Sequence, residues 1–143
     1  VLKVHSTALD AFVSVNEPPA GRIENGKVLW DAPEPAEAAP RLVTEIDPHV
    51  FVLRLTPDLP PSFFSVLSGF SNVIIETFGG GGIPAHMEQA VHSLIESGTR
   101  VLLTTQCIEG GVHLHKDEVG RRAEAMGAVS LGDALAAVMC GEV

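Results

Sequence analysis

The feature that most constrains the fold is an alternation of short apolar runs with helix-like segments along the second part of the chain. The runs are rich in Val, Ile and Leu and have the length of strands that are buried on both sides. Segment 85–97 instead spaces its apolar side chains three and four residues apart, as one face of a helix does. Strands are expected at 50–55, 72–78, 101–104 and 128–130, and helices at 61–67, 85–97 and 116–125.

Strands that alternate with helices in this way predict an α/β fold. We expect a small doubly wound, mostly parallel four-stranded sheet flanked by helices. The connections between its parallel strands should be right-handed. A last helix is expected to begin near Asp133 and to run into Val138.

The first forty residues differ in pattern from the rest. Residues 21–30 form two short runs around Asn25-Gly26, a pair typical of the tight turn in a β-hairpin. The tract that follows is rich in Pro, Ala and Glu and has no apolar periodicity, as extended linkers do. We therefore expect a hairpin segment at 1–30, a linker at 31–41 and an α/β domain at 42–143. Because Val1 reads as the middle of a strand, the chain is expected to be a fragment.

The charge and the cysteine content exclude several classes of function. Eighteen acidic residues stand against nine basic ones, for a net charge of −9, which argues against nucleic-acid binding. No apolar run approaches the roughly 18 residues of a membrane span, so no membrane partner is expected. Cys107 and Cys140 are too few for a disulfide framework, so a reducing cytoplasm is the expected location.

Two of the expected strands end in loops of small and polar residues. The strand at 72–78 runs into a glycine loop, and the strand at 101–104 runs into Thr105-Gln106-Cys107. The carboxyl ends of parallel strands meet at one edge of a sheet, where open α/β folds bind ligands. We therefore expect one binding edge lined by Gly80, Gly81, Gly82, Thr105, Gln106 and Cys107.

These residues leave more than one interpretation open. The glycines are consistent with a loop whose backbone N–H groups bind an anion or carboxylate, and equally with a permissive tight turn. They fit neither a phosphate-binding P-loop nor a dinucleotide fingerprint. Cys107 is either a nucleophile with His113 or His115 as its base, or a small buried side chain. No metal is expected, because the two histidines have no third ligand in view.

Four motifs, in order along the chain, resemble the L-asparaginases and related glutaminases. Residues 7–27 resemble the closing part of their amino-terminal domain, and residues 79–84 are similar to their Gly-x-Gly-Asn-x-Pro loop. Thr105-Gln106-Cys107, with Gly110 and Val112, resembles the cytosolic (type I) pattern Thr-Gln-Cys-x-x-Gly-x-Val. Residues 127–133 match the start of the segment that follows, so the resemblance covers nearly the whole chain.

The resemblance implies the carboxy-terminal domain, with the interdomain linker, of a two-domain amidohydrolase. Such enzymes convert L-asparagine and water into L-aspartate and ammonia with a threonine nucleophile of the amino-terminal domain. The Thr-Gly-Gly-Thr signature of that domain is absent from these 143 residues, so the chain is expected to be inactive alone. The implied partners are the amino-terminal domain, a second copy in at least a dimer, and a small amino-acid ligand. No cofactor is implied.

Some positions depart from the family pattern. Gly82 stands where the family's glycine loop carries Asn, and Asp117 stands where cytosolic members usually carry Tyr. Periplasmic members have near that place a Glu that contacts the substrate ammonium across the subunit interface. Asp117 or the neighbouring Glu118 is therefore a candidate for such a carboxylate, or else a solvated acid in the first turn of a helix. Some cytosolic members bind asparagine as a regulator beside the Thr-Gln-Cys segment, which makes Cys107 a candidate ligand contact.

Two other functions stay open alongside this one. The chain is alternatively a non-enzymatic module that binds an amino acid, regulates or dimerises through the same edge. A third possibility is a hydrolase that depends on Cys107.

Overall fold

The computed structural model describes residues 2–31 and 42–131. The chain divides into two compact units, Val1–Leu42 and Val43–Val143. Residues 32–41 of the expected linker, the expected last helix from Asp133, and Cys140 lie outside the described residues.

The first unit consists of two small antiparallel sheets. In one, β1 (Leu2–Lys3) pairs with β2 (Phe12–Val13), and in the other β3 (Gly21–Glu24) pairs with β4 (Lys27–Trp30). Asn25 and Gly26 have φ values of 49° and 74°, so the turn between β3 and β4 has the two left-handed positions that an Asn-Gly pair favours. The predicted hairpin is therefore confirmed.

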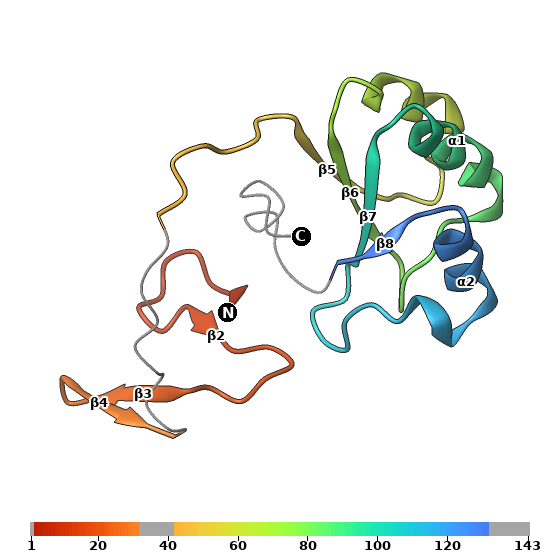
Figure 1. Ribbon diagram of the computed structural model, residues 1–143. Coiled ribbons are helices and arrows are strands. Elements are labelled where there is room, and N and C mark those ends of the chain that lie inside the picture. The colour runs from red at the N-terminus through yellow and green to blue at the C-terminus, as the bar shows by residue number, and fades with distance from the viewer. Residues whose placement is uncertain (1, 32–41, 132–143) are drawn as a thin grey trace. The chain divides into compact units, whose positions relative to one another are not determined.

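The second unit is a parallel four-stranded sheet flanked by helices, which confirms the predicted α/β fold class (Figure 1). Its strands lie in the order β5-β6-β7-β8, and each pairs with the next in parallel. The helical elements lie between them in the chain. In order, the elements are β5 (Val50–Arg54), η1 (Pro61–Leu67), β6 (Asn72–Thr77), α1 (Ala85–Glu96), β7 (Arg100–Thr105), η2 (Leu114–Lys116), α2 (Glu118–Ala125) and β8 (Val129–Ser130).

The strand order explains where the helices of this unit lie. Parallel connections are right-handed, so strands that follow one another in chain order receive their crossover helices on the same face. Figure 1 shows η1, α1 and α2 on one side of the sheet. The main core lies there and includes Val73, Ile75, Phe64, Met87 and Ala123. The other face carries a second buried cluster of Ile74, Leu102 and Leu131.

One predicted helix is divided in the structure. The expected helix at 116–125 is replaced by the short 3-10 turn η2 and by α2, which begins only at Glu118. Between them Asp117 has an extended backbone, with φ −130° and ψ 175°, because it serves as the N-cap of α2. No helix among the described residues has the length and apolar character that crossing a bilayer requires.

Candidate functional site

The candidate site is the edge of the sheet where β6 and β7 end. Thr77 and Thr105 are paired neighbours in the parallel register, so the loops that follow the two strands start side by side. The Thr105 hydroxyl joins these loops: its Oγ1 donates to the Gly79 carbonyl at 2.5 Å and accepts from the Cys107 backbone N–H at 3.0 Å. The predicted meeting of the two loops at one edge is thus seen directly.

Gln106 ties three strand ends together at this edge. Its side-chain Nε2 donates to the Leu55 carbonyl at 2.7 Å and to the Glu76 carbonyl at 2.9 Å, just beyond β5 and within β6. Its backbone N–H donates to the Thr77 carbonyl at 2.9 Å. Because both amide protons of the side chain are used within the protein, the amide holds the edge in shape and has no N–H left to donate to a ligand.

The glycine loop is divided into an open half and a packed half. A Cβ added at Gly79 or Gly80 would meet no heavy atom within 4 Å. A Cβ at Gly81 would lie 2.8 Å from a Leu114 methyl carbon, and one at Gly82 would lie 2.8 Å from a Val119 methyl carbon. The first half of the loop is therefore accessible, as a loop that binds an anion or carboxylate requires. The second half has glycines because the segment that leads into α2 approaches the loop closely, as in a tight turn.

Replacing Gly82 with the Asn of the family pattern is expected to destabilise this protein by about 2 kcal/mol. The position has φ 105°, outside the left-handed region near +60° that Asn tolerates, and the new Cβ would meet Val119. Urea unfolding of Gly82→Asn measures the loss. Gly80→Asn is the matched control because space is open there, and equal losses at both positions would contradict the packing explanation.

The segment from His113 to Gly120 closes the site on its other side. The His113 backbone N–H donates to the Gly80 carbonyl at 2.8 Å, so this segment contacts the glycine loop directly. The Asp117 Oδ1 accepts from the Gly120 backbone N–H at 2.8 Å and caps α2. This supports the interpretation of Asp117 as an acid that serves the helix start, while contact with a substrate ammonium stays a prediction.

Glu118 takes part in an ion-pair network on the surface of the helices. The Arg122 Nη1 donates to Glu118 at 2.8 Å, and the Arg122 Nε donates to Glu88 of α1 at 2.8 Å. Glu88, and to a smaller extent Glu118, raise the pKa of Arg122 through these hydrogen bonds and their charge. The network joins α1 to α2. Glu118 is therefore paired with Arg122 of its own helix.

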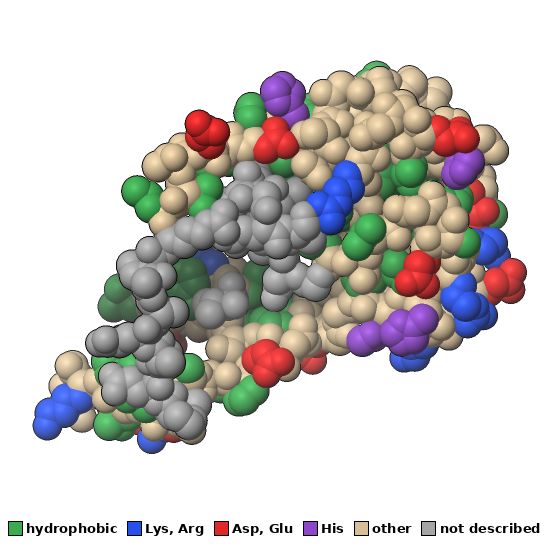
Figure 2. All heavy atoms as spheres, in the orientation of Figure 1, with side chains coloured by type: hydrophobic (Ala, Val, Ile, Leu, Met, Phe, Trp, Pro, Cys, Tyr) green, Lys and Arg blue, Asp and Glu red, His purple; other side chains and the backbone are tan. Residues whose placement is uncertain are grey.

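The side chain of Cys107 is exposed, so its interpretation as a small buried residue is wrong. The rings of His113 and His115 lie 6.2 Å apart, edge to face. Figure 2 shows histidines beside Lys and Arg side chains on the surface over η2 and α2. Within residues 2–31 and 42–131, no three His, Cys, Asp or Glu side chains are grouped so as to hold a metal ion.

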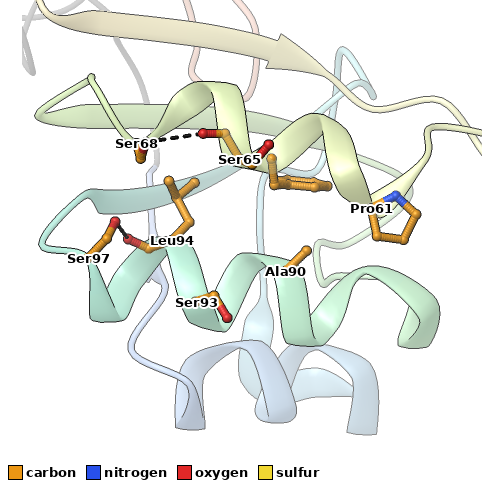
Figure 3. A pocket seen from close by; sticks show the side chains of 8 residues that line it. Pro61, Ser65, Ser68, Ala90, Ser93, Leu94 and Ser97 are labelled. Carbon is orange, nitrogen blue, oxygen red and sulfur yellow. Dashed lines mark hydrogen bonds between the residues drawn. The ribbon is translucent and has the colours of Figure 1, made fainter.

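A separate surface pocket of about 260 Å³ lies between η1 and α1 (Figure 3). Its walls carry four serines, of which three donate to carbonyls of their own helical segments: Ser65 to Ser62, Ser68 to Ser65 and Ser97 to Leu94. These hydroxyls are satisfied and no charged group lines the pocket, so it lacks the convergent polar groups of a ligand site. The candidate site therefore remains the edge beyond β6 and β7.

The chain is similar in sequence to several known proteins. Residues 49–139 match the family model for the Glutaminase/Asparaginase C-terminal domain. The chain is 36% identical over 137 residues to an L-asparaginase of Thermococcus kodakarensis, a match that covers 93% of this chain and 42% of that protein. It is 30% identical to one component of the Glutamyl-tRNA(Gln) amidotransferase of Halobacterium salinarum, covering 94% of this chain and 35% of that component.

The structure agrees with these sequence matches. The thermostable L-asparaginase from Thermococcus kodakarensis superimposes with a TM-score of 0.81 at 34% identity, over 92% of this chain and 41% of the other. The chain thus spans less than half the length of the relatives it matches.

Proposed function

Because the chain belongs to the Glutaminase/Asparaginase C-terminal domain family, we propose that it works as the carboxy-terminal part of an asparaginase-type amidohydrolase. The parent reaction is the hydrolysis of L-asparagine to L-aspartate and ammonia. The observation that carries the proposal is the match to the Thermococcus kodakarensis L-asparaginase, which extends over 93% of this chain and beyond the limits of the family model.

In this proposal the edge beyond β6 and β7 forms one wall of the substrate or effector site. Gly80, Gly81, Gly82, Thr105, Gln106 and Cys107 build that wall, and Asp117 and Glu118 begin the helix beside it. Gln106 and Thr105 hold its shape through the hydrogen bonds described above. The open side of Gly80 and the exposed Cys107 remain accessible to a small amino-acid ligand.

The catalytic nucleophile belongs, in this proposal, to a preceding domain. Amide hydrolysis by this route needs a nucleophile, its base and an oxyanion site together, and the sequence lacks the family's Thr-Gly-Gly-Thr signature. We therefore propose that the chain is inactive alone. Its resemblance to the cytosolic type supports a cytoplasmic homodimer as the complete enzyme, in which the second copy completes the site. No cofactor enters this chemistry.

A chimera tests the proposed function. In the Thermococcus kodakarensis L-asparaginase, the 137 matched residues are replaced by this chain, and ammonia release from L-asparagine is measured. We expect the chimera to exceed the isolated chain by at least about 100-fold, because only the chimera holds a nucleophile. Enzyme-like ammonia release by the isolated chain would overturn the proposal. If a thiol alkylator then abolished that release, the alternative of a Cys107-dependent hydrolase would be favoured.

A folded chimera without activity has a different meaning. If it nevertheless bound asparagine, aspartate or glutamine in a calorimetric titration, the alternative of a non-enzymatic amino-acid-binding module would replace the enzyme. Glutamine is included because one of the relatives is part of an amidotransferase.

A further inference from the structure

The turn between β3 and β4 exposes an asparagine that is followed directly by a glycine. Asn25 and Gly26 are both exposed, and a Cβ added at Gly26 would meet no heavy atom within 4 Å. Neither the Asn25 side-chain amide nor the Gly26 N–H forms a hydrogen bond with any residue that the structure describes. The side-chain carbon of Asn25 and the backbone nitrogen that follows it are therefore held only by the turn itself.

The hairpin holds this turn weakly. Its strands β3 and β4 have four residues each, and among the described residues they pair only with each other. Isolated two-stranded hairpins are marginally stable in water, and such elements open locally at little cost. Asn25 also has a φ of 49°, in the left-handed region that is less favourable for any residue with a Cβ. Opening of the turn therefore lets the Asn25 backbone rotate into other conformations.

We propose that Asn25-Gly26 is a site of spontaneous deamidation, with water as the co-reactant. The Gly26 nitrogen attacks Cγ of Asn25, forms a bond to it and gives up its proton. The bond from Cγ to the side-chain nitrogen breaks, and that nitrogen leaves as ammonia. Water then opens the cyclic imide at either of its carbonyls, which leaves aspartate or isoaspartate at position 25. No group is oxidised or reduced, and the inference is independent of the proposed function.

The reaction should alter the hairpin that carries it. In isoaspartate the main chain runs through the former side chain, so the turn becomes one atom longer. A two-residue turn fixes the register in which Glu24 pairs with Lys27 and Gly21 with Trp30. The longer turn no longer fits this register. Either product also adds a negative charge to a chain whose net charge is already −9.

The other two asparagines of the sequence lie in surroundings that disfavour the reaction. Asn72 is half-buried at the start of β6, where its Nδ2 donates to the Asp47 carboxylate at 3.3 Å. Its backbone is held in a parallel sheet, so it cannot rotate as a turn residue can. Asn16 is exposed, but the residue after it is Glu17, whose side chain crowds the attacking nitrogen. Both asparagines serve as internal controls.

Peptide mapping by mass spectrometry tests the proposal. The chain is incubated at mildly alkaline pH, and conversion of amide to acid is followed at each asparagine and in a synthetic peptide of residues 21–30. We expect Asn25 to convert at least about tenfold faster than Asn16 or Asn72, and within about tenfold of the peptide. The rate should rise with pH, because the attacking nitrogen must lose its proton. Gly26→Ala should slow conversion by about tenfold or more, since a methyl group crowds that nitrogen.

Cross-strand NMR contacts between β3 and β4 test the effect on the hairpin. They should weaken in the aged chain in proportion to its isoaspartate content. Asn25→Asp is the matched control, because it carries the same charge without the additional main-chain atom, and it should keep these contacts. Contacts between β6 and β7 should be unchanged in both samples.

Each outcome either supports or overturns this inference. An unchanged Asn25 after the peptide has fully converted would overturn it, because the hairpin would then protect its turn. Equal rates at the three asparagines, or an unaltered rate in Gly26→Ala, would also overturn it. The ammonia released distinguishes this reaction from the proposed function. Deamidation at this site yields one ammonia per chain and then stops, whereas release by an enzyme continues as long as L-asparagine is supplied.

Discussion

Replacing Gly120 with Ala is expected to lower the free energy of unfolding by about 3 kcal/mol or more, although Ala is ordinarily the better helix former. A Cβ at Gly120 would lie 2.1 Å from the Leu114 carbonyl oxygen and 2.7 Å from its carbon, both backbone atoms that no side-chain rotation can move away. Either η2 or α2 must shift, and with them the Asp117 cap and the segment against the glycine loop.

Urea unfolding of Gly120→Ala measures this effect, with Gly69→Ala as the matched control. At Gly69 an added Cβ meets nothing within 4 Å, and no left-handed φ is required. The control should therefore leave stability unchanged or raise it slightly. If the two variants unfolded at the same urea concentration, the close contact between α2 and Leu114 would not be what holds this segment.

Changing Gln106 to Glu is expected to cost about 3 kcal/mol at neutral pH. The substitution keeps the size of the side chain but places carboxylate oxygens where an amide group donates to the Leu55 and Glu76 carbonyls. Two hydrogen bonds are lost, and a charge faces two partially negative oxygens. As a result, the Gln106 side chain no longer links the ends of β5, β6 and β7.

The loss in Gln106→Glu should depend on pH in a defined direction. A protonated carboxyl can donate to one of the two carbonyls, so the folded state favours the neutral form, and its pKa lies above the unfolded value of about 4.3. The variant therefore loses stability as the pH rises from about 4.3 through the folded-state pKa. Urea unfolding at several pH values measures this, with Gln89→Glu on the exposed side of α1 as the control. The same pH dependence in both variants would contradict the role of Gln106.

The sheet itself was predictable because its signals are local. The apolar runs from Val50, Asn72 and Arg100 are short, β-branched and separated by helical periodicity, and each became a strand of the parallel sheet. The Asn-Gly pair specified the hairpin turn for the same reason, since two residues set their own φ values. The helix expected at 116–125 is wrong at its start, because Asp117 caps α2 and does not lie within a helix.

The candidate site was only partly predictable. That Thr105 and the glycine loop meet follows from parallel strands ending at one edge, which a sequence can reveal. The Gln106 amide donates to two carbonyls because three strands pack together at this edge. No sequence pattern near Gln106 signals these hydrogen bonds. The same holds for Gly120, whose importance lies in the approach of the Leu114 backbone.

The sequence alone determined the fold class, the hairpin, the family and the edge at which ligands are expected, because periodicity, turn residues and motifs are properties of neighbouring residues. Only the tertiary structure decided which side of that edge is open. It did so through contacts between distant residues, such as the bond from Gln106 to a carbonyl 51 residues away. It also showed that Ile23, Val28 and Trp30 remain uncovered, because burial depends on what packs against a surface and not on the strand that carries it.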